Sequence, residues 1–141
     1  MKYLLDTNAC INGLHKHNPI FTQRFLAVPE TDKVVCSIAR AELYYGAYKS
    51  KWPQNSLADL QAFLQPYPNL DFDLIAARIC GEIRAELARK GTPIGPNDVQ
   101  IAAIALAHGL TVVTHNIREF SRVPKLILED SAPVDGSACG V

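Results

Sequence analysis

Met1-Lys-Tyr-Leu-Leu-Asp-Thr-Asn8 is the stretch that decides the fold, because a short apolar run stops in it abruptly on polar residues. A run of this length, bounded by turn-forming residues, predicts a buried strand that feeds a loop or the start of a helix. In an open α/β sheet, ligands gather outside the carboxyl ends of the strands, which is where Asp6 would lie. The alternative is that Asp6, Thr7 and Asn8 only cap the next helix, since aspartate is common at that position.

The composition is that of an ordinary globular protein. The 141 residues fit one domain with a real core, since 48% of them are hydrophobic and 20% are charged. No apolar run approaches the ~20 residues that span a bilayer, and no signal peptide is evident, so we expect a cytoplasmic protein without membrane contact. The net charge is zero, which argues against a protein that coats nucleic acid but allows an enzyme with basic residues around one site.

Four cysteines are scattered along the chain without a C-x-x-C pair: Cys10, Cys36, Cys80 and Cys139. Cys36 and Cys80 fall in apolar segments, so we expect them to be small buried hydrophobic residues. A disulfide framework is not expected in a chain with this much core material. A zinc cluster of Cys10, His15 and His17 would lack the four ligands and the paired spacing of a structural site.

Strand-like and helix-like segments alternate along the chain. Strands are expected at 2–5, 34–37, 70–72, 111–114 and 126–128. Helices are expected at 9–14, 19–28, 38–48, 56–65, 74–90 and 97–109. Ser37 and Asp73 are the expected caps of two of these helices, and the helix at 97–109 is apolar almost all round, so it should be buried.

This alternation predicts an α/β fold, an α/β/α sandwich with a mostly parallel central sheet of about five strands. One domain is expected at 1–132. The remaining segment, 133–141, has two glycines and no periodicity, so it is expected to be a flexible C-terminal tail.

Acidic residues recur where the predicted strands end. Asp6 follows the first strand, Glu42 lies in the first turns after the second, and Asn116 and Glu119 follow the fourth. Asp98 opens the buried helix, where it is either a simple N-terminal acid or a carboxylate that is costly to bury without a partner. Acids aimed at one edge repel, and a divalent cation would compensate them. Mg²⁺ takes oxygen ligands and can activate water and stabilise an in-line phosphoryl displacement.

An ordered set of motifs extends over nearly the whole chain. They are Leu4-Leu5-Asp6-Thr7-Asn8, the segments 37–46 (SIARAELYYG) and 83–87 (IRAEL), 91–98 (GTPIGPND), 101–103 (IAA), 113–120 (VTHNIREF) and 128–130 (LED). With this order and spacing, the sequence resembles the PIN-domain ribonucleases, specifically the VapC toxins of bacterial type II toxin–antitoxin systems. Two features depart from the family pattern: Asn116 stands where many PIN domains carry aspartate, and the tail after Asp130 is longer.

The resemblance implies a site built on Asp6, Glu42 and Asp98, with Asp6 and Asp98 as metal ligands and with Thr7 and Asn8 supporting Asp6. It implies Mg²⁺, or Mn²⁺ in its place, and hydrolysis of RNA that leaves a 3′-hydroxyl and a 5′-phosphate. Transfer RNA or another structured RNA would be the substrate, and its cleavage would inhibit translation and growth. The implied partners are a VapB-type antitoxin inserted into the active-site groove, a second copy in a homodimer, and operator DNA reached through the antitoxin in a larger assembly.

The fourth acid of the site is expected to be Glu119. If 116–120 makes a helical turn, Asn116 and Glu119 lie on one face because they are three residues apart. Asn116 offers only a neutral oxygen or an amide donor, so Glu119 would supply charge while Asn116 orients a water or a phosphate oxygen. The alternative is that Glu119 pairs with Arg118 or Arg122 on the surface, where such pairs contribute only ~0–1 kcal/mol.

Two other classes of function stay open. A catalytically impaired PIN-like binding module would follow if Asn116 had removed a metal ligand. A receiver-type signalling domain shares the strand–helix alternation, but it needs paired acids after the first strand and a lysine after the fifth, neither of which is present. The residues that bind RNA are not identified by any motif. Surface candidates are Lys49, Lys51, Trp52, Arg118 and Arg122.

One aromatic stretch is a candidate interface. Exposed side chains are expected among Tyr44, Tyr45, Tyr48 and Trp52, and Tyr and Trp are enriched where proteins meet. We therefore expect this stretch to contribute to binding the antitoxin, unless Tyr44 and Tyr48 belong to the core.

Overall fold

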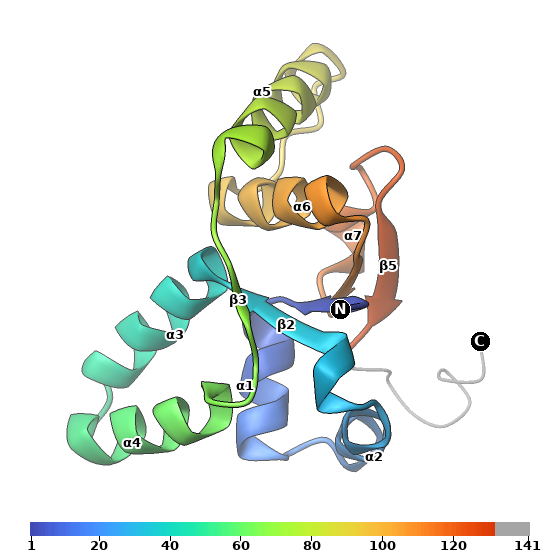
Figure 1. The fold of residues 1–141 in the computed structure, drawn as a ribbon. Coiled ribbons are helices and arrows are strands. Elements are labelled where there is room, and N and C mark those ends of the chain that lie inside the picture. The colour runs from blue at the N-terminus through green and yellow to red at the C-terminus, as the bar shows by residue number, and fades with distance from the viewer. Residues whose placement is uncertain (132–141) are drawn as a thin grey trace.

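A computed structural model describes residues 1–131, in which a sheet of five strands separates two groups of helices (Figure 1). The strands are β1 (Tyr3–Leu5), β2 (Lys33–Cys36), β3 (Asn69–Leu70), β4 (Thr111–Thr114) and β5 (Ile127–Asp130). Their order is β3-β2-β1-β4-β5, and all four neighbouring pairs are parallel. The expected five-stranded, mostly parallel sheet is thus confirmed.

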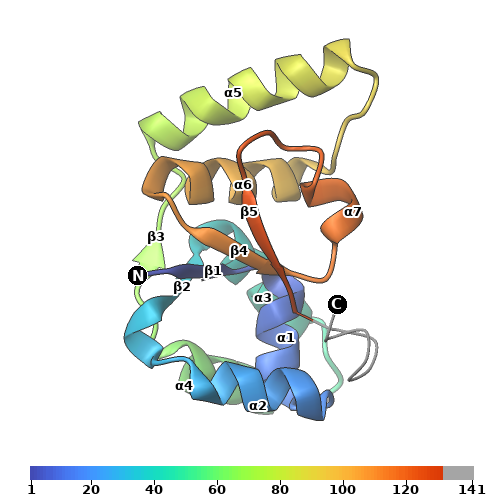
Figure 2. The same cartoon turned by 90° about the vertical axis from the view of Figure 1, so that its right-hand side faces the viewer.

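Helices cover both faces of this sheet. They are α1 (Thr7–His15), α2 (Pro19–Ala27), α3 (Ser37–Tyr48), α4 (Pro53–Leu64), α5 (Leu74–Arg89), α6 (Pro96–His108) and α7 (Ile117–Phe120), with a 3₁₀ turn η1 (Glu30–Asp32). In both views α6 lies against one face with α5 outside it, and α1, α2, α3 and α4 lie on the other face (Figures 1 and 2). This arrangement is the expected α/β/α sandwich.

The strand order places a crevice at the middle of the sheet. From β1 the chain winds outward to β2 and β3, and it then returns past β1 to β4 and β5. The helices that leave β1 and β4 therefore diverge to opposite faces, which opens a crevice at their carboxyl ends. Asp6 directly follows β1, and Asn116 lies two residues beyond β4. The fold alone thus brings these two positions to one place.

Helix α6 is the buried helix of the fold, as its apolar sequence predicted. Its buried residues are Val99, Ile101, Ala102, Ala103, Ile104 and Ala105. Gly109 ends it in the left-handed conformation with φ +65°, which glycine adopts without steric cost. The helix is therefore a rigid support for Asp98 in its first turn.

Several element boundaries differ by one to three residues from the sequence-based expectation, and three of these differences have a clear cause. Ser37 is the first residue of α3 rather than its cap, and its hydroxyl instead donates to the Leu70 carbonyl at 3.3 Å. Helix α4 begins at Pro53 rather than at 56, because proline suits the first helical position. Strand β5 extends to Asp130, since its pairing with β4 continues through Thr114. The expected cap by Asp73 is confirmed: its carboxylate accepts from the Ala76 amide at 2.9 Å.

A buried lysine fastens α2 to the sheet. Lys33 opens β2 and has only 3% of its surface exposed. Its Nζ donates to the Phe25 carbonyl at 2.8 Å and lies 3.7 Å from the centroid of the Phe25 ring. Burial lowers the pKa of this amine. Because α2 makes these contacts through its last turn, the amine holds that end of the helix against the sheet.

Cys36 and Cys80 are small core residues, as expected, and Cys10 is another. Cys10, Cys36 and Cys80 are buried and unpaired. Within residues 1–131, no helix combines the length and the apolar character that crossing a membrane requires. Cys139 and the expected tail at 133–141 lie outside the described residues, so the flexibility of that tail and a domain boundary at 132 stay predictions.

Candidate active site

Asp6 is a buried carboxylate with two sets of neighbours. As the N-cap of α1 it accepts a hydrogen bond from the Ala9 amide at 2.8 Å. It also hydrogen-bonds the side chain of Thr114, the last residue of β4. Only 4% of its surface is exposed, and this burial raises its pKa from 3.8 to about 6 despite both hydrogen bonds. Asp6 therefore caps α1, and the cap leaves its charge undercompensated.

Two further acids meet Asp6 from different helices. Repulsion by Asp98, in the first turn of α6, and by Glu42, in α3, adds to the rise in the pKa of Asp6. The pKa of Asp98 is itself raised, first by burial and then by the charges of Glu119 and Glu42. The charges of Glu42 and Asp98 reach Asp6, and that of Glu42 also reaches Asp98, although long stretches of chain separate these residues. The three acids therefore lie near one another at one crevice.

Thr7 contacts a different acid from the one expected. Its hydroxyl donates to Oε1 of Glu42 at 2.6 Å, so it ties the start of α1 to α3. Thr7 thus orients Glu42 rather than Asp6. Asn8 is exposed at the next position.

Asn116 links two acids through one amide nitrogen. Its Nδ2 donates to Oδ2 of Asp98 at 2.9 Å and to Oε2 of Glu119 at 2.8 Å. Asn116 is the N-cap residue of α7, and Glu119 lies one turn on, as the spacing of three predicted. The backbone amide of Asn116 donates to Oγ1 of Thr114 at 2.9 Å, which anchors it to the end of β4. Both protons of the side-chain amide are used, so its carbonyl oxygen is the atom left to contact a ligand.

Glu119 is held toward the site rather than toward the surface arginines. Its Oε1 accepts from the Gly95 amide at 3.3 Å, which fixes the turn that begins α6. Its pKa is lowered, first by the hydrogen bond from Asn116, then by the Gly95 amide, and least by the charges of Arg122 and Arg118. The side chain of Arg122 donates to the Pro93 carbonyl at 2.8 Å. Arg122 and Glu119 therefore both brace the 91–96 turn.

A surface hollow of about 560 Å³ opens beside the acids. Its lining residues are Thr7, Ile38, Ala41, Glu42, Tyr45 and Asn97. Because Glu42 forms part of its wall, a ligand in the hollow would contact the acid site directly.

Comparison with known proteins agrees with this geometry. The family model described as the PIN domain matches residues 3–126. The tRNA(fMet)-specific endonuclease VapC of Salmonella typhimurium is 45% identical, over 92% of this chain and 98% of that protein. The chain belongs to the VapC family of PIN-domain ribonucleases.

Solved structures place the VapC fold in complexes. The DNA-bound VapBC of Salmonella typhimurium has a chain with a TM-score of 0.87 and 44% identity, which covers 94% of this chain and 99% of that one. A chain of VapBC2 from Rickettsia felis, bound to a promoter DNA fragment, has a TM-score of 0.84 and 39% identity, with 92% and 98% covered. The expected family, fold and ribonuclease class are thus confirmed.

PIN-domain nucleases such as VapC generally depend on a metal ion, and the donor atoms here suit a hard cation. Asp6, Glu42 and Asp98 present only oxygen atoms, as Mg²⁺ prefers. Among residues 1–131, no three His, Cys, Asp or Glu side chains are already grouped tightly enough to hold a metal. The arrangement therefore fits a cation held by one or two carboxylates and otherwise by water and substrate oxygens. The raised pKa of Asp6 is the sign that such a positive charge would be stabilising.

Two contributors to the VapC site were missed from the sequence. Thr114 hydrogen-bonds both Asp6 and the Asn116 backbone, and the Gly95 amide holds Glu119. Thr114 could have been found from the sequence, because it places a hydroxyl at the last position of a predicted strand, beside the crevice. No sequence signal marks Gly95, because a backbone amide is present at every residue other than proline.

Proposed function

We propose that this chain is a Mg²⁺-dependent endoribonuclease toxin that cleaves transfer RNA. Asp6 and Asp98 are the metal ligands, with Mn²⁺ as the alternative cation, and Glu42 and Glu119 complete the acidic site. The cut leaves a 3′-hydroxyl and a 5′-phosphate, and it takes place in the cytoplasm, where it inhibits translation. The relative named as tRNA(fMet)-specific supports transfer RNA as the substrate.

The observation that carries the proposal is the buried charge of Asp6. A carboxylate whose pKa is raised to about 6, with two more acids beside it, is poised to gain from a cation. A residue that served only as a cap would not need to be charged or to lie beside two other acids, since an uncharged asparagine caps a helix equally well.

The side chains divide the chemistry between them. A divalent cation, when bound, supplies electrostatic stabilisation of the phosphate in an in-line displacement and lowers the pKa of water. Glu42, held by Thr7 at the wall of the hollow, faces the space where the RNA backbone would enter. Asn116 fixes Asp98 and leaves its own carbonyl oxygen to accept a hydrogen bond from a water or a ribose hydroxyl.

The proposal includes partners. Relatives have been crystallised as VapBC complexes on DNA, and we infer that a VapB-type antitoxin inserts into the groove and neutralises this chain. The chain acts as a homodimer, and operator DNA is bound through the antitoxin. Expression of this chain alone should arrest growth, and co-expression of the antitoxin encoded beside it should restore growth.

The test is cleavage of purified transfer RNA by wild-type protein and by Asp98→Asn, with sequencing of the new RNA 5′ ends. Wild-type protein should cut in Mg²⁺ and stop in EDTA, and Asp98→Asn should lose cleavage while its circular dichroism spectrum stays native. The matched control is Asp59→Asn, an acid in α4. Loss of activity through unfolding of Asp98→Asn, or cleavage that persists in EDTA, would contradict the proposal.

A further inference from the structure

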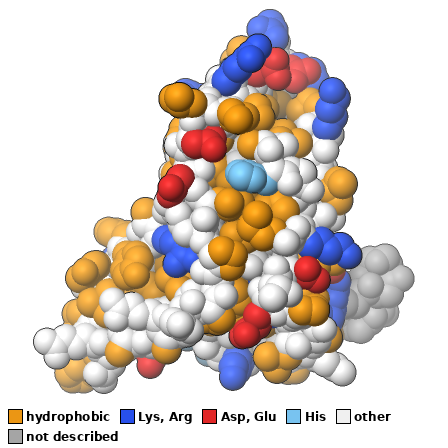
Figure 3. Space-filling view, in the orientation of Figure 1, with side chains coloured by type: hydrophobic (Ala, Val, Ile, Leu, Met, Phe, Trp, Pro, Cys, Tyr) orange, Lys and Arg blue, Asp and Glu red, His pale blue; other side chains and the backbone are white. Residues whose placement is uncertain are grey.

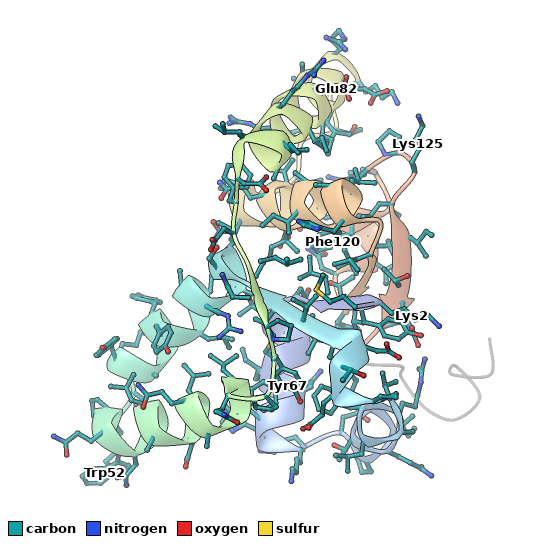
Figure 4. All side chains as sticks on the ribbon, in the orientation of Figure 1. Lys2, Trp52, Tyr67, Glu82, Phe120 and Lys125 are labelled. Atoms are coloured by element: carbon teal, nitrogen blue, oxygen red, sulfur yellow. The ribbon has the colours of Figure 1, made fainter. Side chains whose placement is uncertain are left out.

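Three exposed aromatic side chains lie between the acid site and the tip of the hairpin that α3 and α4 form. Tyr45, Tyr48 and Trp52 expose 65%, 65% and 66% of their surface. Figure 4 shows Trp52 at that tip, pointing away from the body of the molecule. In Figure 3 hydrophobic side chains are visible along the same arm. Large rings at this degree of exposure contribute little to the core, so another role should explain them.

These rings continue the acid site in space. Glu42, Tyr45 and Tyr48 are spaced by three along α3, so they form one stripe on its surface. Tyr45 and Glu42 line the same hollow. Tyr48 lies roughly 9 Å along the helix axis from Glu42, at 1.5 Å per residue, and Trp52 follows in the turn before α4. The stripe therefore leads from the acids to the tip of the hairpin.

Two lysines lie beside the rings. Nζ of Lys49 lies 4.9 Å from the centroid of the Tyr45 ring, and Nζ of Lys51 lies 5.5 Å from that of Trp52. Residues 43–58 contain these two lysines and no aspartate or glutamate, although the whole chain has a net charge of zero. Lysine is depleted in protein–protein interfaces, whereas lysines between exposed aromatic rings match a strand of stacked bases and phosphates.

We propose that Tyr45, Tyr48, Trp52, Lys49 and Lys51 form an RNA-stacking surface. It holds a single-stranded segment of the substrate by stacking bases on the rings and pairing phosphates with the lysines, and it leads that segment into the acid site. The inference rests on the proposed function for the identity of the substrate. It adds that unpaired bases beside the cut, rather than a duplex, are what this chain grips.

The test measures RNA binding without cleavage. In the Asp98→Asn background, fluorescence anisotropy with a labelled single-stranded RNA of about ten nucleotides should show Trp52→Leu and Tyr48→Leu each weakening binding by about tenfold. Trp52→Phe should stay close to wild type, because it keeps a ring. Lys49→Gln and Lys51→Gln should each lower the slope of log affinity against log salt by about 0.7.

Matched controls lie on α5. Leu74→Ala removes a side chain with 88% of its surface exposed, and Lys90→Gln removes a surface cation. Both should leave single-stranded RNA binding unchanged, and all variants should keep the wild-type Tm. A labelled RNA duplex of the same length should bind more weakly than the single strand and should not respond to Trp52→Leu.

Wild-type RNA affinity in both Trp52→Leu and Tyr48→Leu would overturn the inference. So would variants that keep RNA affinity but lose the complex with a VapB-type antitoxin, since the surface would then be a protein interface. Size-exclusion chromatography should show that the variants keep the oligomeric state of the wild type. If RNA binding weakens only because a dimer is lost, the RNA-stacking surface is also rejected. Ring-dependent RNA binding by a wild-type protein that fails to cut would reject the proposed nuclease and leave the stacking surface standing.

Discussion

Asp6 and Glu119 are both acids of the same crevice, and their surroundings shift their pKa values in opposite directions. Asp6 is buried beside other acids, and its pKa rises to about 6. Glu119 receives hydrogen bonds from Asn116 and from the Gly95 amide, and its pKa is lowered. Proximity to the crevice does not by itself make a residue a metal ligand. The undercompensated acid is the one that a cation stabilises, whereas the compensated acid shapes the site.

The largest expected difference between the two residues is in catalysis. Asp6→Asn should reduce RNA cleavage by about 10²–10³-fold, since it removes charge from the reacting centre. The fold should persist, because asparagine accepts the capping hydrogen bond of α1 as well as aspartate does. Glu119→Gln should lose much less. The two variants are compared by their cleavage rates at saturating Mg²⁺, and circular dichroism checks that both are folded. Equal losses in both variants would remove the distinction.

The next expected effect is on stability against pH without metal. Because the folded-state pKa of Asp6 lies above its unfolded value, the folded form binds the proton more tightly, so the free energy of unfolding falls as pH rises from about 4 through about 6. The full effect is about 3 kcal/mol at 1.36 kcal/mol per unit, of which about 2 falls between pH 4.5 and 7.5. Urea unfolding in EDTA measures it. The difference in unfolding free energy between wild type and Asp6→Asn separates the contribution of Asp6 from that of other titrating groups. The same pH dependence in both proteins would contradict the raised pKa of Asp6.

Much of this site was accessible from sequence, for a definite reason. Asp6 ends an apolar run, Glu42 follows the next strand, and parallel strands bring their carboxyl ends to one edge. Even the meeting of Asn116 with Glu119 follows from a spacing of three in a helical turn. These inferences need only the order of elements and their periodicity.

Other features depend on which side chains happen to touch. The pairing of Thr7 with Glu42 joins two helices, and no spacing within either segment encodes it. Lys33 is buried although lysine is rarely buried without a partner, because its partner is a backbone carbonyl that the sequence does not reveal. The identity of a contact between distant elements is set by packing, which local patterns do not specify.

A smaller effect is expected on metal-linked stability. Mg²⁺ at about ten times its dissociation constant should raise the free energy of unfolding by about 1.4 kcal/mol at pH 7.5. The shift should vanish in Asp6→Asn and persist in Glu119→Gln. Thermal unfolding with and without EDTA measures it, with Ca²⁺-free buffers throughout. An equal Mg²⁺ shift in Asp6→Asn would show that the cation binds elsewhere.

The smallest expected effect concerns Glu119 itself. Glu119→Gln should move the Mg²⁺ midpoint of RNA cleavage upward by about threefold, a free-energy change of about 0.7 kcal/mol, while maximal rate at saturating Mg²⁺ changes less. The charge of Glu119 contributes to the field at Asp98, although Asn116 and Gly95 already compensate it. A titration of cleavage against Mg²⁺ measures the midpoint. An unchanged midpoint would leave Asp6, Glu42 and Asp98 as the entire acidic site.

The buried amine of Lys33 can be used to measure how often α2 separates from the sheet. An amine-reactive reagent needs an accessible, unprotonated nitrogen, and Lys33 reaches that state only when the last turn of α2 detaches from the Phe25 carbonyl contact. Burial lowers the pKa of this amine only while α2 covers it. Once uncovered, the amine reacts like an ordinary exposed lysine, so the opening of α2 sets the labelling rate. The rate of Lys33 labelling relative to exposed Lys90 therefore measures how often this corner separates from the sheet. A partner that holds α2 against the sheet would therefore lower the rate at which Lys33 is labelled.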